Sequence, residues 1–177
     1  GHLSSPQIAK IIKTYHPKGV LLIRTPIDQH ISRQKALHIG SWRSVDTTCL
    51  RPKIYAKDFR ASRLRQQNHY RMGLYLLERF GCPVTKIHYE DLYAEGSDPI
   101  ELIRDSLQKI DIYLPKKIAP AKDLQRQDRS DDRSRKVSNW EAFEEEIVRL
   151  GAREELDSFD LRYNSLILSA QLLIERI

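Results

Sequence analysis

The chain contains little of what metal, redox and membrane proteins need. Only two of its 177 residues are cysteines, Cys49 and Cys82, and their spacing matches no metal-binding motif. The six histidines form no H-E-x-x-H or H-x-x-x-H pattern, so we predict no metal site. No run of 18 or more apolar residues predicts a transmembrane segment, and no secretory leader is visible. We therefore expect reduced thiols and a cytoplasmic protein.

Charge is what the chain has in quantity. Charged residues make up 31% of the sequence and the formal net charge is +6, while 40% of the residues are hydrophobic. This length and apolar content predict one domain over residues 1–177. A basic balance suits a phosphorylated small molecule or an acidic glycan. Basic and aromatic residues are not interleaved as a base-stacking platform requires, so we do not expect nucleic acid as a partner.

Hydrophobic periodicity and turn residues predict helices and strands in alternation, which is typical of an α/β fold with a short parallel sheet flanked by helices and a helix-rich C-terminal half. The strand at 20–24 is apolar on both faces, as in a sheet covered on both sides. A second strand is predicted at 84–89. Helices are predicted at 6–15, 28–39, 58–80, from 99 onward, at 140–150 and toward the end of 159–177.

Two stretches read differently. Residues 41–55 lack periodicity and predict a loop over a ligand. Residues 121–136 contain almost no apolar side chains, so they cannot offset their ordering entropy by burial, and we expect a mobile polar segment there. The long helix at 58–80 carries a basic face, which is either solvated surface or a binding surface for an anionic acceptor. Its members are Arg60, Arg63, Arg65 and Arg71.

The most informative stretch is GVLLIRTPIDQHIS, residues 19–32. An apolar strand stops at Arg24, a Thr-Pro turn follows, and the next helix carries Asp28 and, one turn later, Ser32. Ligands of open α/β sheets bind at such strand ends, and a helix start attracts phosphate. A guanidinium can bond a phosphate through two nitrogens. Arg24 and Ser32 are therefore a candidate phosphate clamp, although an ordinary ion pair between Arg24 and Asp28 would also explain the charge.

This stretch resembles the 3′-phosphate-binding motif of the sulfotransferases that use 3′-phosphoadenosine 5′-phosphosulfate (PAPS). The spacing of eight from Arg24 to Ser32 is the family spacing. The strand ending in Tyr-Glu-Asp-Leu at 89–92, the helix opening at Asp98-Pro99 and the basic stretch before Trp140 are similar to later family segments. The resemblance covers roughly residues 2–150, corresponding to the later two-thirds of the family's domain. It implies part of a three-layer, P-loop NTPase-like fold.

The resemblance also implies roles for particular residues. Arg24 and Ser32 would hold the 3′-phosphate of PAPS or of its product, adenosine 3′,5′-bisphosphate, with Arg135 and Lys136 closing over it. His2 would be the general base that takes the proton of a hydroxyl or amine acceptor. Trp42 and Arg43 would line the site of that acceptor, a small molecule or a glycan. No metal is required.

One departure from the family limits what these residues imply. The family's phosphosulfate-binding turn has no counterpart here, because the seven glycines are scattered and none lies in a G-x-x-x-x-G-K-[ST] setting. We therefore expect a sulfotransferase fragment that is inactive alone and that self-associates or associates with the missing part. The alternative is a non-catalytic relative that binds an anionic ligand or a protein. A third hypothesis, a P-loop kinase-like phosphotransferase, would need a Walker lysine and a magnesium ligand, and neither is evident.

Overall fold

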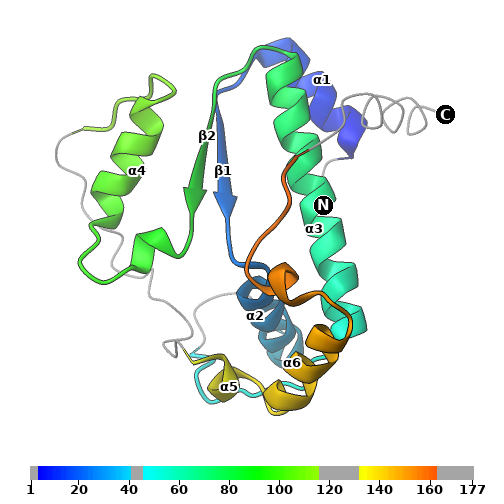
Figure 1. Ribbon diagram of the computed structural model, residues 1–177. Coiled ribbons are helices and arrows are strands. Elements are labelled where there is room, and N and C mark those ends of the chain that lie inside the picture. The colour runs from blue at the N-terminus through cyan, green and yellow to red at the C-terminus, as the bar shows by residue number, and fades with distance from the viewer. Residues whose placement is uncertain (1–3, 41–45, 116–131, 163–177) are drawn as a thin grey trace. The chain divides into compact units, whose positions relative to one another are not determined.

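The computed structural model describes residues 4–40, 46–115 and 132–162. The chain divides into two compact units, and each is described here by itself. The first comprises Gly1–Ile23, Gln66–Ile118 and Asp160–Ile177, and the second comprises Arg24–Arg65 and Ala119–Phe159. The long helix α3, Ala56–Arg79, contributes residues to both units (Figure 1).

The first unit is built on a parallel pair of strands. Strand β1 (Gly19–Ile23) pairs with β2 (Val84–His88), and Gly19 lies opposite Val84. Helix α1 (Ser5–Tyr15) precedes β1, while a 3-10 turn (Asp91–Tyr93) and α4 (Pro99–Gln108) follow β2 (Figure 1). Asp98 caps α4, since its carboxylate accepts from the backbone N–H of Ile100 at 2.9 Å.

The core of the first unit lies where α1, the second half of α3 and the turn before β2 meet. Ile12, Tyr75, Leu76 and Cys82 are buried there. Gly19 brings β1 close to α3, because a Cβ atom at this position would lie 2.6 Å from a methyl carbon of Leu77. On the opposite side, α4 packs on β2.

The second unit is helical. It contains α2 (Pro26–Ile39), α5 (Arg133–Lys136), α6 (Trp140–Arg149) and a 3-10 turn (Arg153–Leu156), together with the first half of α3. Gly40 ends α2 in the left-handed region with φ of 63°, a conformation that favours glycine. Buried side chains from α2, α3, α6, the 3-10 turn and the residues next to these elements form its core. They are Ile27, Ile31, Ile54, Ala56, Phe59, Val137, Phe143, Ile147, Ala152 and Leu156.

The α/β class and the parallel strand pair are confirmed, and the predicted elements lie within a few residues of those observed. The two cysteines are free thiols, as predicted. The prediction that β1 is covered on both faces was wrong, because Val20 and Leu22 remain 46% and 49% exposed.

A P-loop NTPase-like arrangement with three layers stays a prediction. Within the described part of the chain, no helix is both long and apolar enough to cross a membrane.

The polar segment predicted at 121–136 is described only from residue 132 onward. There Asp132 caps the short helix α5 and Lys136 is buried, and composition predicted neither feature. Composition did not show this because the burial depends on residues far away in the sequence. The apolar positions of the predicted closing helix, from Leu166 onward, lie outside the described residues, as do Trp42 and Arg43 of the predicted loop.

His30 is a polar side chain within the core of the second unit. It is 3% exposed, its ring packs edge-on against Phe59 at 5.7 Å, and no described residue gives either ring nitrogen a hydrogen bond. Burial lowers the pKa of His30 from 6.5 to about 4; Asp58 opposes this shift and Arg33 and Arg65 add to it. The imidazole is therefore neutral at pH 7 and its polar atoms are a cost to stability.

We expect acid to destabilise the protein through His30 before it protonates the carboxylates. Between pH 6.5 and about 4 the unfolded chain binds a proton that the folded chain does not. The free energy of unfolding should therefore fall as the pH falls through this window, by up to roughly 3 kcal/mol. His30→Leu should flatten this dependence and stabilise the protein at pH 7 by about 1–2 kcal/mol. Urea denaturation at several pH values measures both effects. His69→Leu, at an exposed position of α3, is the control, and an unchanged slope in His30→Leu would contradict the assignment.

Candidate anion-binding site

The start of α2 carries the residues that the sequence singled out. Arg24 follows β1 directly and is partly buried, and Thr25 is the N-cap of α2 with Pro26 as its first residue. Proline at this position suits a helix start because it lacks the N–H that the helix cannot satisfy there. The first-turn N–H groups and the positive end of the helix dipole are therefore directed at whatever lies before α2.

Asp28 and Ser32 are four residues apart on α2 and thus lie on the same side of it. Both side chains are partly buried. Asp28 lies in the first turn, where a carboxylate interacts favourably with the helix dipole. The structure consequently places one anionic and one hydroxyl side chain next to each other along the face that begins at the candidate phosphate site.

The basic residues of α5 lie against Asp28. Lys136 Nζ is 2.9 Å from one carboxylate oxygen of Asp28, and Arg133 Nη2 is 3.1 Å from the other. The Lys136 side chain is 6% exposed, so its ammonium needs this counter-charge. Arg133 also pairs with Asp157 at 2.8 Å. The arrangement is a chain of charges in which Arg133 joins two carboxylates and Asp28 joins two cations.

Electrostatics favour the ionised form of Asp28. Burial alone would raise its pKa, but the hydrogen bond from Lys136 and the charges of Lys136 and Arg133 outweigh burial, so the pKa of Asp28 lies below 3.8. For Arg133, burial works against the charge, yet Asp28 and Asp157 raise its pKa above the usual value. Asp28 and Arg133 are therefore both charged at neutral pH.

Of the sequence-predicted site residues, Lys136 contacts Asp28 in the first turn of α2, which lies between Arg24 and Ser32 along the chain. Arg135 differs from Lys136: its side chain is 81% exposed and pairs with Asp132 at 3.4 Å. Asp28 accepts hydrogen bonds from two cationic side chains of α5, Arg133 and Lys136, which are distant in the sequence. His2, Trp42 and Arg43 lie outside the described residues, so their predicted roles stay predictions.

Sequence reasoning did not assign Arg133 or Lys35 to this region. Lys35, one turn beyond Ser32, is 1% exposed and donates to the backbone carbonyl of Thr47 at 3.0 Å. This hydrogen bond ties part of the predicted 41–55 loop to α2. The signal for Lys35 was its spacing of seven residues from Asp28, which places both on one helix face, but a lysine in such a position usually reaches solvent.

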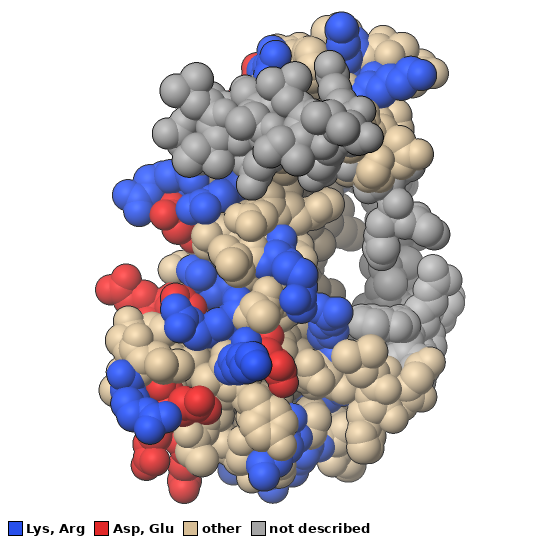
Figure 2. Space-filling model, turned by 90° about the vertical axis from the view of Figure 1, so that its right-hand side faces the viewer, with Lys and Arg blue, Asp and Glu red and all other residues tan. Residues whose placement is uncertain are grey.

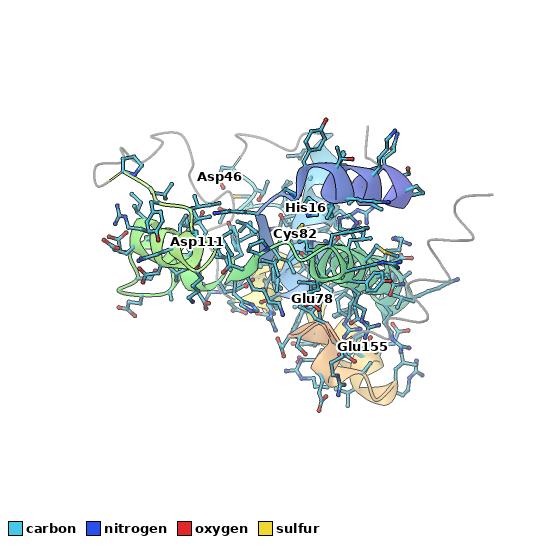
Figure 3. All side chains as sticks on the ribbon, turned by 90° about the horizontal axis from the view of Figure 1, so that it is seen from above. His16, Asp46, Glu78, Cys82, Asp111 and Glu155 are labelled. Atoms are coloured by element: carbon cyan, nitrogen blue, oxygen red, sulfur yellow. The ribbon has the colours of Figure 1, made fainter. Side chains whose placement is uncertain are left out.

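Arginines on the basic face of α3 form hydrogen bonds and ion pairs with other residues of the protein. Figure 2 shows acidic atoms interspersed with the basic ones on the face that it presents. In the second unit, Arg60 bonds Glu155 through two nitrogens at 3.1 and 3.2 Å, and Arg63 donates to the carbonyl of Ser158 at 3.0 Å. Glu155 is labelled in Figure 3 on the segment that follows α6. In the first unit, Arg71 binds Asp160 through its backbone and its carboxylate. Three of the four arginines thus have acceptors within the described part of the chain.

Metal ligation and known relatives add no alternative. Among the described residues, no group of three or more histidine, cysteine or acidic side chains is placed to hold a metal ion. No family model, no curated protein and no solved structure matches the chain.

We expect Arg63 to contribute more to stability than Arg60. The Arg63 side chain is 13% exposed, bonds a backbone carbonyl and lies over the Phe159 ring at 5.9 Å, whereas Arg60 is 45% exposed. Arg63→Met should cost about 1–3 kcal/mol, because a largely buried guanidinium loses its hydrogen bonds to the Ser158 carbonyl. Arg60→Met should stay within about 1 kcal/mol, as exposed ion pairs do. Urea denaturation of the two variants measures both losses of stability. A larger loss in Arg60→Met than in Arg63→Met would contradict this prediction.

Proposed function

We propose that the chain is the nucleotide-binding part of a PAPS-dependent sulfotransferase. The observation that carries this is the meeting of two distant segments at one helix start. Arg24, Ser32 and the first turn of α2 come from the predicted phosphate clamp, and Lys136 from the predicted closing segment contacts Asp28 in that turn. The family resemblance groups these same segments around the 3′-phosphate.

The donor set suits a phosphate dianion. A guanidinium before the helix, a hydroxyl on its second turn and the free N–H groups of its start are the groups that bind phosphate in proteins. Arg135, which is 81% exposed, supplies a cation that can reach a bound ligand without breaking a buried pair. Asp28 forms ion pairs with Arg133 and Lys136, so its negative charge is compensated where an anion would bind.

In the proposed reaction, PAPS supplies the sulfuryl group. The acceptor oxygen or nitrogen forms a bond to sulfur while the bond from sulfur to the 5′-phosphate oxygen breaks, which releases adenosine 3′,5′-bisphosphate. The acceptor proton passes to a base, and the resemblance assigns that role to His2. The described residues would bind and orient the nucleotide. Stabilising the leaving phosphate needs the phosphosulfate-binding turn, and the printed sequence contains no such motif.

That missing motif is the specific observation behind a second candidate, a non-catalytic module that binds the same kind of anion. The two candidates differ in one outcome. Both bind adenosine 3′,5′-bisphosphate, but only a sulfotransferase transfers sulfuryl from PAPS to a hydroxyl or amine once the turn is supplied. Displacement of the ligand by ATP with Mg²⁺ would instead favour a phosphotransferase.

We expect the chain to bind adenosine 3′,5′-bisphosphate and Arg24→Met to weaken that binding most. Loss of a charge-assisted contact costs about 2–3 kcal/mol, or roughly 30- to 100-fold in Kd, while Ser32→Ala should cost roughly fivefold. Titration calorimetry on the full chain measures both values.

Two control variants keep this test specific. Arg149→Met, at the exposed last turn of α6, and Ser97→Ala, in the first unit, should leave Kd unchanged. No binding by the wild type, or equal losses in the control and site variants, would overturn the proposed function.

A further inference from the structure

Asp28 is an anion within a site proposed for an anion, and this requires an explanation. Its carboxylate side chain is 16% exposed and accepts from two cations of the same short helix: Lys136 at 2.9 Å and Arg133 at 3.1 Å. An uncompensated carboxylate here would repel a phosphate. The contribution of Asp28 to the site must therefore lie in the residues that it holds in place.

What it holds is a helix too short to maintain its own position. Four residues form barely one turn, and such a turn is unstable without tertiary contacts. Two hydrogen bonds tie α5 and the residues after it to the segment before α3: the Arg51 side chain donates to the carbonyl of Ser134 at 3.0 Å, and the carbonyl of Pro52 accepts from the N–H of Ser138 at 3.2 Å. The ion pairs with Asp28 set the same turn against α2.

We propose that Asp28 is a positioning residue that sets the register between α5 and the start of α2, and so places Lys136 for the 3′-phosphate. This inference rests on the proposed function. Lys136 has three N–H donors, and the described residues take one of them, at Asp28. The ammonium can consequently bond Asp28 and a ligand oxygen together. Arg133 also forms an ion pair with Asp157, whose side chain is 57% exposed.

The test compares two nucleotides that differ only in the 3′-phosphate. For each protein variant, calorimetry gives Kd for adenosine 3′,5′-bisphosphate and for adenosine 5′-monophosphate, and their ratio measures recognition of that phosphate. Asp28→Asn keeps the size of the side chain but removes its charge, and we expect the ratio to fall roughly tenfold. General loosening of the protein would weaken both nucleotides equally and leave the ratio unchanged.

Three further variants separate position from stability. Asp28→Glu restores the charge and should recover most of the ratio. Asp157→Asn removes only the exposed partner of Arg133 and should change the ratio less than threefold, since the Lys136 pair remains. The double variant Asp28→Asn with Lys136→Met leaves no unpaired ammonium, so it should fold, and its ratio should equal that of Lys136→Met alone.

Hydrogen exchange provides a readout without ligand. The backbone amides of residues 134–137 should exchange faster in Asp28→Asn than in the wild type, while those of α4 in the first unit should not change. An unchanged nucleotide ratio and unchanged exchange in Asp28→Asn would overturn the positioning role and leave the proposed function standing. A wild type that binds neither nucleotide would overturn the proposed function, and exchange alone would then decide whether Asp28 anchors α5.

Discussion

The pairing of Asp28 with two cations is the interaction on which the candidate site depends. Lys136 is almost fully buried, and a buried ammonium is tolerated only beside an anion. Asp28 supplies that anion from the first turn of α2, where the helix dipole also favours a carboxylate. The Asp28 carboxylate therefore interacts both with the dipole of α2 and with the cations of α5. It links two segments that lie 108 residues apart.

The basic balance of the sequence has a different meaning once the partners of individual arginines are known. A net charge of +6 suggests an anionic partner, and the arginines on one face of α3 are natural candidates for binding it. Glu155, Ser158 and Asp160 instead accept from three of them, so these cations fasten the segment after α6 to the helix. The arginines on this face of α3 therefore have a structural use that the net charge alone does not reveal.

Local signals predicted the secondary structure well. An apolar run after Gly19 marks β1, Asp98-Pro99 marks the start of α4, and Gly40 marks the end of α2. Each of these signals acts within a few residues, through caps, φ values or hydrophobic periods. The short helix α5 was not predicted, because composition indicated a mobile chain there. The burial of Lys136 comes from contacts with residues far away in the sequence, which local patterns do not include.

By itself, the sequence determined the order of the strands and longer helices, the parallel pairing of the strands and the place of a candidate phosphate clamp at Arg24 and Ser32. Those features follow from short-range physics and from motif spacing. Only the tertiary structure decided which charges meet: that Asp28 receives Lys136 and Arg133, that Lys35 is buried, and that the α3 arginines have internal acceptors. The reason is that an ion pair depends on distance in space. Nothing in the spacing of residues 28, 133 and 136 along the chain encodes that distance.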